Sequence, residues 1–242
     1  NTEPRDMYLA RVAAIEGGLS QDVPAMTLNR LCGSGLQAIV SASQAILLGD
    51  ADAAVAGGAE VMSRGPYVMP SARWGARMGD ARVLDMMTGA LHDPFKTIHM
   101  GVTAENVAKE FNITREDQDA LALESHHRAE KAWAEGRFKD QIVPITFETR
   151  KGTVVFDTDE HPRMTTMEAL AKMKPAFKKD GSVTAGNASG INDGAAAVVV
   201  MSAEKAKELG VTPLARLVSS ASAGVDPSVM GIGPIFATNK AL

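Results

Sequence analysis

Cys32, the only cysteine of the chain, lies in the glycine-rich stretch Asn-Arg-Leu-Cys-Gly-Ser-Gly at residues 29–35. Residues 24–28 are apolar and predict a buried strand, and apolar residues at helical spacing follow the cysteine as far as Gly49. Cys32 is therefore expected at a strand-to-helix turn, where unpaired N–H groups and the helix dipole favour a thiolate. This pattern indicates a nucleophile. The alternative is a small buried cysteine that packs as an apolar side chain.

A second stretch rich in small residues and amides, Thr-Ala-Gly-Asn-Ala-Ser-Gly-Ile-Asn-Asp-Gly, occupies residues 184–194. A backbone with this much glycine can approach a ligand closely. Ser189 and Asn187 can offer it hydrogen bonds. On the residues alone, an elaborate turn without a ligand is the favoured interpretation of the stretch.

The histidines do not predict a metal site, because none pairs with a cysteine or carboxylate at metal-ligand spacing. His126 and His127 are neighbours on a predicted helix, cannot face one partner together and are expected to be solvated. His99, beside Met100, can line a pocket or serve as a structural histidine. No Ser/His/Asp arrangement, phosphate loop or dinucleotide fingerprint is present.

Composition is that of an ordinary globular protein, with 242 residues, 45% of them hydrophobic and 22% charged. A net charge of −4 without a basic stripe argues against a nucleic-acid partner. The longest apolar run, residues 195–201, is strand-sized, so no membrane span is expected. A single cysteine suits a reducing, cytoplasmic setting. Because the chain opens at Asn1, it is expected to be a piece of a longer protein.

The elements that would position these motifs follow from hydrophobic spacing and capping residues. Helices are expected at residues 7–15, 36–47, 83–91, 103–108, 115–136, 167–173 and 203–209, with Thr114 and Asp117 as a capping pair and Ser202 as a cap. Strands are expected at residues 24–28, 53–58, 195–201 and 214–219, and a two-stranded ribbon at residues 142–147 and 154–157. The strand–helix–strand order around Cys32 predicts a parallel sheet.

A change of texture marks a boundary near Met62, where periodicity gives way to a stretch rich in Gly, Pro and Arg. Sheet character returns after residue 190. The predicted organisation is an α/β core formed by residues 1–61 and 191–212, interrupted by an inserted segment at 62–190. Residues 213–242 are expected to begin a second core.

Three motifs together resemble those of the thiolase family: residues 29–35, residues 184–190, and His-Met-Gly-Val-Thr-Ala-Glu-Asn-Val-Ala at residues 99–108. Within it the chain is most similar to bacterial β-ketothiolases and acetyl-CoA acetyltransferases. The resemblance implies a five-layered αβαβα core of two similar halves, with a loop domain inserted in the first. It also implies a homotetramer of two dimers, held together through residues 64–80.

The resemblance further implies an acyltransferase in which the Cys32 thiolate takes the acyl group from an acyl-CoA, for thiolysis or Claisen condensation. The Cys32 backbone N–H would help to hold the oxyanion. Coenzyme A would be a substrate, and no other cofactor or metal is implied. Arg163 would meet the nucleotide end of CoA. The implied pantetheine channel is lined by Leu91, His99, Met100, Ala176, Phe177, Ala185, Ser189, Ile191 and Met230.

The sequence departs from the family pattern in its catalytic motifs. Thiolases carry Gly-His-Pro, Cys-x-Gly and Asn-Glu-Ala-Phe motifs in their C-terminal half, whereas here the only His-Pro is His161-Pro162 and no second cysteine exists. We therefore expect a central fragment of a thiolase that does not turn over alone. The alternative is a non-catalytic CoA-binding or oligomerisation module, and a ketoacyl synthase is a third, less consistent reading.

Overall fold

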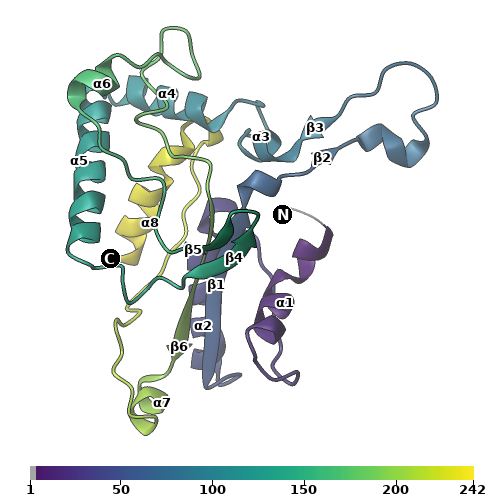
Figure 1. Ribbon diagram of the computed structural model, residues 1–242, viewed down its shortest axis with the longest axis vertical. Coiled ribbons are helices and arrows are strands. Elements are labelled where there is room, and N and C mark those ends of the chain that lie inside the picture. Colours follow the sequence, from purple (N-terminus) through teal and green to yellow (C-terminus); the bar gives the residue numbers. More distant parts are fainter. Residues whose placement is uncertain (1–3) are drawn as a thin grey trace. The chain divides into compact units, whose positions relative to one another are not determined.

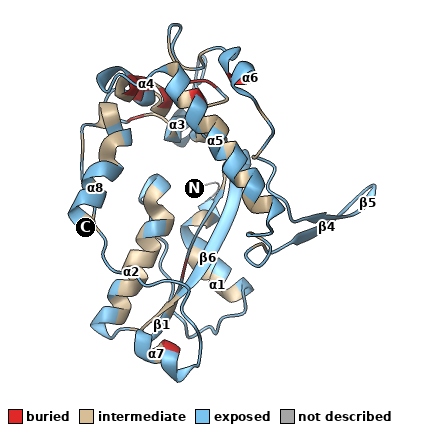
Figure 2. Ribbon diagram, turned by 90° about the vertical axis from the view of Figure 1, so that its left-hand side faces the viewer, coloured by how far each residue is buried: buried red, intermediate tan, exposed pale blue. Residues whose placement is uncertain are grey.

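The computed structural model describes residues 4–242 and has mixed helix and strand content (Figure 1). Buried apolar residues are Ala56, Ala108, Leu170, Val183 and Ala206, shown in red with the buried polar residues in Figure 2. Many larger apolar side chains are exposed, among them Val55 and Val199 on strands. Apolar strand faces are therefore open to solvent in the part of the chain that is described.

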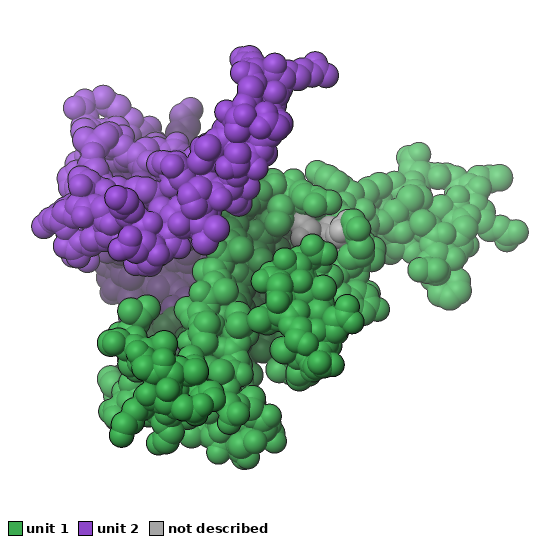
Figure 3. Space-filling model, turned by 60° about the horizontal axis from the view of Figure 1, so that its bottom comes forward, with its two compact units in different colours: residues 1–91, 191–223, 234–242 green, residues 92–190, 224–233 purple. Residues whose placement is uncertain are grey.

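The chain divides into two compact units, drawn in separate colours in Figure 3. Unit 1 runs to Leu91 and resumes over Ile191–Ala223 and Pro234–Leu242, and unit 2 comprises His92–Gly190 and Gly224–Gly233. Unit 2 thus begins about thirty residues after the texture change at Met62 and ends where sheet character returns. The boundaries drawn from the sequence remain a prediction, since compact units and family domains are different divisions.

Unit 1 is built on a two-stranded antiparallel sheet of β1 (Ala53–Val61) and β6 (Asp193–Met201). The register pairs Ala53 with Met201 at one end and Val61 with Asp193 at the other. Helix α2 (Ser34–Leu48) packs along both strands and ends at Gly49, whose left-handed φ of 79° is a conformation that glycine adopts without strain.

The remaining elements of unit 1 are short. They are the 3-10 helices η1 (Pro4–Tyr8), η2 (Leu31–Gly33), η3 (Met62–Arg64) and η4 (Pro70–Trp74), the strands β2 (Tyr67–Val68) and β3 (Leu84–Asp85), and the helices α1 (Leu9–Glu16), α3 (Met86–Ala90), α7 (Ala203–Glu208) and α8 (Gly233–Ala241). Ser202 caps α7 by accepting from the Lys205 N–H, as the sequence predicts.

Unit 2 is mainly helical, with α4 (Met100–Glu110), α5 (Arg115–Ala134), α6 (Met167–Ala171) and the 3-10 helix η5 (Pro227–Ile232). The predicted capping box at the start of α5 is present in both directions between Thr114 and Asp117. The predicted ribbon is confirmed as an antiparallel pair, β4 (Ile145–Thr149) and β5 (Gly152–Phe156).

Three sequence expectations about strands are wrong. Residues 24–28 and 214–219 have no strand structure, and β1 pairs antiparallel with β6 instead of entering a parallel sheet. A strand exists only where a neighbour supplies N–H and C=O partners. Neither segment finds such a neighbour within residues 4–242. Residues 83–91 also begin as β3 before they become α3.

One described stretch, Leu31–Leu48, is long and apolar enough to cross a membrane by length and composition alone. The sequence expectation concerned unbroken apolar runs, so this broader test neither confirms nor contradicts it. Core helices of soluble proteins pass the same test. Helix α2 packs along β1 and β6, and none of this stretch is buried within residues 4–242.

Candidate active site

Cys32 lies in η2, one turn ahead of α2, and it is exposed. Its exposure contradicts the alternative of a buried cysteine that packs as an apolar side chain. The turn also differs from the prediction, because an irregular segment rather than a strand leads into it. An accessible sulfur at the start of a 15-residue helix is placed to act as a nucleophile.

Leu31, directly before the cysteine, has a left-handed φ of 48°, which costs a residue with a Cβ roughly 1–2 kcal/mol. Neighbouring side chains stabilise this conformation. The Leu31 N–H donates to Asn29 Oδ1 at 2.7 Å. The Ser34 hydroxyl donates to the Leu31 carbonyl at 2.7 Å. The same hydroxyl accepts from the Arg30 N–H at 2.9 Å. The sequence motif did not reveal this strain.

His99 stands at the start of α4 in unit 2, where its Nδ1 accepts from the Gly101 N–H at 3.0 Å. Its ring stacks on Phe177 at 4.6 Å between centroids and meets His92 edge-on at 5.0 Å. Burial of the ring, and then the neighbouring His92, lower the pKa of His99 below its ordinary 6.5. The neutral ring that results is the form that can accept at Nδ1.

Several other predicted channel residues lie in the same unit as this histidine. The Ala176 N–H donates to the Val183 carbonyl at 2.9 Å, and Pro175 bridges to Thr184, so Ala176 and Phe177 run beside the chain that leads to Ala185. Met230 lies on η5, which packs against α4 and is tied to it by the Asn106 amide, a donor to the Ser228 carbonyl at 2.9 Å. Unit 2 therefore brings together predicted channel residues from distant parts of the chain.

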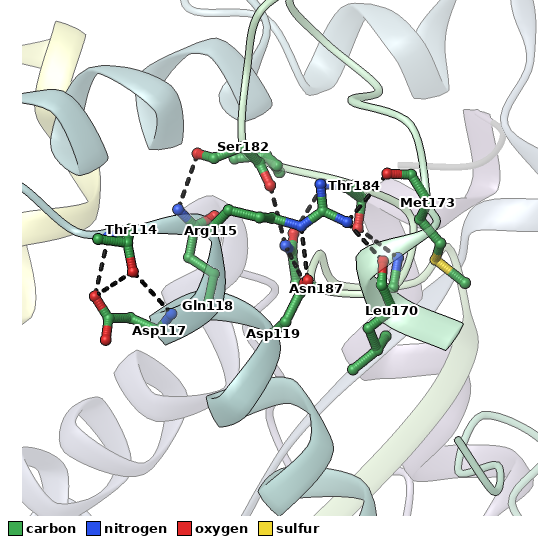
Figure 4. A network of polar contacts seen from close by, with 12 residues as sticks. Thr114, Arg115, Asp117, Gln118, Asp119, Leu170, Met173, Ser182, Thr184 and Asn187 are labelled. Atoms are coloured by element: carbon green, nitrogen blue, oxygen red, sulfur yellow. Dashed lines mark hydrogen bonds and ion pairs between the residues drawn. The ribbon is translucent and has the colours of Figure 1, made fainter. Parts of the chain in front are cut away.

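The loop at residues 184–190 is held by a network of polar contacts (Figure 4). Asn187 donates to Asp119 Oδ1 at 2.9 Å and accepts from the Thr184 N–H at 2.8 Å. The suggestion that Asn187 offers hydrogen bonds to a ligand is therefore wrong, since its amide is engaged within the protein. Ser189 is exposed.

Glu105, a buried carboxylate on α4, anchors the other end of the same loop. It accepts from the Ser182 and Val183 N–H groups at 2.8 Å each and from the Ser182 hydroxyl at 3.1 Å. Burial pushes the pKa of Glu105 upward, but these hydrogen bonds, together with Lys178, outweigh it and lower the pKa below 4.5. Nothing in the sequence indicated this role beyond the helical spacing of the motif.

Glu105→Gln is expected to destabilise the protein at neutral pH by about 1–3 kcal/mol, because an amide cannot accept at both of its terminal atoms. A carboxyl whose pKa is lowered on folding stabilises the protein above its unfolded pKa and loses that contribution as pH falls through the folded value. The deficit of the variant should therefore shrink below about pH 4.5. Thermal unfolding across pH measures it, with exposed Glu110→Gln as control. A loss of stability in Glu105→Gln that did not change with pH would contradict a stabilising role of the ionised Glu105 carboxylate.

Arg163, also in unit 2, lines a cavity of about 240 Å³ together with Glu130, Trp133, Thr158, Asp159, Pro162 and Met164. Its backbone N–H donates to His126 Nδ1 at 3.5 Å, and the His126 ring stacks on His161 at 6.1 Å. The expectation of a solvated His126 is therefore wrong, because the ring is half-buried beside Arg163.

The two remaining predicted channel residues, Leu91 and Ile191, belong to unit 1, as Cys32 does. Ile191 is two positions before Asp193, whose carboxylate accepts from the Ser63 N–H at 2.9 Å and from the Ser63 hydroxyl. Within residues 4–242 no group of three or more His, Cys, Asp or Glu side chains is arranged to hold a metal ion. The roles of all these residues toward a substrate stay predictions.

Comparison with known proteins shows a consistent pattern. Residues 2–204 match the family model described as thiolase, N-terminal domain. Beta-ketothiolase BktB of Cupriavidus necator is 65% identical over 243 residues, which are 100% of this chain and 62% of that protein. An acetyl-CoA acetyltransferase of Pseudomonas aeruginosa is 60% identical over 236 residues, 96% of this chain and 60% of that protein. The chain thus spans about three-fifths of the length of these relatives.

Solved structures agree with the sequence relatives. The acetyl-CoA acetyltransferase of Bacillus anthracis matches with a TM-score of 0.94 and 52% identity, over 99% of this chain and 61% of that one. Human mitochondrial 3-ketoacyl-CoA thiolase in complex with CoA matches with a TM-score of 0.93 and 44% identity, over 100% of this chain and 60% of that one. These likenesses confirm the α/β fold class expected from the motifs.

Proposed function

The chain belongs to the thiolase family, and from that premise we propose that the protein that carries it is an acyl-CoA C-acyltransferase. It would move an acyl group between CoA and acetyl-CoA or a 3-ketoacyl-CoA. The observation that carries the proposal is the exposed Cys32 at the head of α2, within the motif that the family uses for its nucleophile. The match to a human thiolase solved with CoA supports the substrate class.

In the proposed reaction the Cys32 thiolate attacks the thioester carbonyl of the acyl-CoA. The bond from that carbon to the CoA sulfur breaks, CoA leaves as a thiolate, and the acyl group stays on Sγ as a new thioester. In condensation the α-carbanion of acetyl-CoA then attacks this acyl-enzyme, forms the new carbon–carbon bond and releases the Cys32 thiolate. In thiolysis the Cys32 thiolate instead attacks the 3-keto carbon of a 3-ketoacyl-CoA, the C2–C3 bond breaks, and acetyl-CoA leaves as its α-carbanion, which takes up a proton. A CoA thiolate then attacks the acyl-enzyme and releases acyl-CoA and the Cys32 thiolate. The Cys32 N–H, at the start of the helix, stabilises the oxyanion of both steps.

CoA is proposed as a substrate that binds in unit 2 beside His99 and Phe177, whose rings stack, with no separate cofactor and no metal. His99, Met100, Phe177 and the neighbouring loop would hold the pantetheine arm. Arg163 would face the phosphates at the nucleotide end, where a guanidinium matches phosphate geometry. The 240 Å³ cavity beside Trp133 lies next to that arginine and supports this placement.

Thiolysis of acetoacetyl-CoA tests the proposed function. The protein that carries this chain should convert acetoacetyl-CoA and CoA to two molecules of acetyl-CoA. The loss of absorbance of the acetoacetyl-CoA enolate measures the reaction. Residues 1–242 expressed alone should bind CoA poorly and show no turnover, because they contain neither a Gly-His-Pro motif nor a second cysteine. Turnover by residues 1–242 would mean that another group, such as His99, serves as the base.

We further propose that this protein is a cytoplasmic homotetramer of two dimers that acts in fatty acid metabolism. The excursion at residues 64–80 exposes Trp74 at 86% and Met78 at 98%, and exposed apolar side chains of this size mark contact surfaces. Replacing residues 64–80 by a short glycine-serine linker is expected to leave a dimer. Light scattering measures the mass, and an unchanged tetramer would place the dimer–dimer contact elsewhere.

A further inference from the structure

The loop at residues 182–190 carries two predicted CoA contacts, Ala185 and Ser189, yet it has no regular secondary structure. A loop of this kind has no ladder of backbone hydrogen bonds to fix its shape, so side chains from neighbouring elements must do so. In unit 2 those side chains come from α4, which supplies Glu105, and from α5, which lies beside the loop in Figure 4.

Asn187 closes the loop on itself. Its Oδ1 accepts from the Thr184 N–H at 2.8 Å, and its Nδ2 donates to the Ser182 carbonyl at 3.1 Å. The same Nδ2 donates to Asp119 Oδ1 on α5 at 2.9 Å. One amide therefore fixes the loop's internal turn and ties that turn to a helix.

Asp119 is itself held firmly. Its side chain is 2% exposed, and its Oδ2 pairs with Arg115 Nε at 2.7 Å. The Arg115 guanidinium also donates to the Leu170 carbonyl at 2.6 Å and the Met173 carbonyl at 3.0 Å, at the end of α6. Any other arrangement would leave the buried Asp119 carboxylate without Arg115, which is costly. The network therefore favours this one arrangement.

We propose that Asp119 and Asn187 are positioning residues for CoA: they hold the loop in the one conformation that presents Ala185 and Ser189 to the pantetheine arm. This inference rests on the proposed function. Neither side chain touches the substrate in this proposal. The pairing of a donor with an acceptor between positions 187 and 119, not merely the proximity of the two side chains, determines the conformation of the loop.

Two near-isosteric variants test this. Asn187→Asp sets a carboxylate against the Asp119 carboxylate, and Asp119→Asn removes the charge that pairs with Arg115. The double variant exchanges donor and acceptor, so that an amide on α5 donates to a carboxylate in the loop, and it should recover part of what each single variant loses. Glu124→Gln is the matched control, because Glu124 forms an i,i+4 pair with Arg128 at 2.6 Å on the exposed face of the same helix.

The measurements are KM and kcat for acetoacetyl-CoA thiolysis, CoA affinity by calorimetry, and amide hydrogen exchange in residues 183–190. Each single variant should raise KM and the Kd for CoA about tenfold, with kcat close to that of the parent, and should speed exchange in the loop. Alkylation of Cys32 by iodoacetamide, which needs no CoA site, should proceed at an unchanged rate, and an unchanged thermal unfolding midpoint shows that the protein is folded. The control variant should match the parent throughout.

Faster exchange in the loop with an unchanged KM would overturn the positioning role. A double variant whose KM was no lower than that of Asn187→Asp alone would overturn it as well. If Asn187→Asp does not fold, Asp119→Asn still decides, because it removes the charge that holds the Asp119 side chain against Arg115 but leaves a side chain of the same size. A parent protein that bound no CoA would overturn the proposed function itself, and the positioning role with it. Parent binding with unaltered variants would overturn only the positioning role.

Discussion

Replacement of Cys32 by serine in the protein that carries this chain is expected to lower acyl transfer at least about a thousandfold, as loss of a covalent nucleophile does. A serine hydroxyl is a much weaker nucleophile than a cysteine sulfur at neutral pH. The side chain is exposed, so the exchange should not disturb packing. Mass spectrometry after incubation with acetyl-CoA should find an acetyl group on the parent and none on the variant.

Unchanged thermal unfolding of Cys32→Ser would separate loss of the nucleophile from loss of the fold. Ser43→Ala, on the same helix, is a suitable control, because Ser43 only donates to the Ile39 carbonyl within α2. Normal turnover by Cys32→Ser would remove Cys32 from the mechanism and with it the acyl-enzyme.

Gly101→Ala is expected to destabilise unit 2 by about 1–3 kcal/mol, the usual cost of overpacking, and to raise KM for the acyl-CoA. A Cβ at Gly101 would overlap three carbons of the Phe177 ring, which lies against the first turn of α4. Phe177 would have to move, and its stacking on His99 would be lost. Thermal unfolding and steady-state kinetics measure the two effects.

Gly89→Ala serves as the control, since a Cβ at Gly89 in α3 would meet no atom within 4 Å. A smaller partner should relieve the clash, so Gly101→Ala combined with Phe177→Leu is expected to recover stability but not the KM. Stability of Gly101→Ala equal to that of the parent would show that Phe177 can shift without cost.

The sequence predicted those parts of the fold that depend on neighbouring residues. The capping box of Thr114 and Asp117, the cap at Ser202 and the stop at Gly49 are all present, because each satisfies backbone groups within one helical turn. The ribbon of β4 and β5 followed from alternation around a short turn. The motif around Cys32 indicated a turn before a helix, and the comparisons confirm the family.

What the sequence could not predict depends on distant partners. The pairing of β1 with β6 joins segments that the whole insertion separates in the sequence. The order of apolar and polar residues in each strand is the same for a parallel and an antiparallel pair, so it could not predict the direction. The role of Asn187 was misjudged for the same reason, since its partner Asp119 lies 68 positions earlier on a helix whose other faces are charged. The left-handed Leu31 is equally hidden, because leucine is an unusual choice for that conformation.

The hydrogen bonds between Ser63 and Asp193, at the end of the β1–β6 pair, have a consequence for synthesis on the ribosome. Its two residues are 130 positions apart, so at about 5–20 residues per second β1 leaves the ribosome roughly 7 to 26 seconds before β6. During that time the nascent β1 lacks the strand with which it pairs, while α4 and α5 can already form between them. The length of the intervening segment, rather than the stability of the finished sheet, sets how long a chaperone would have to shield that strand.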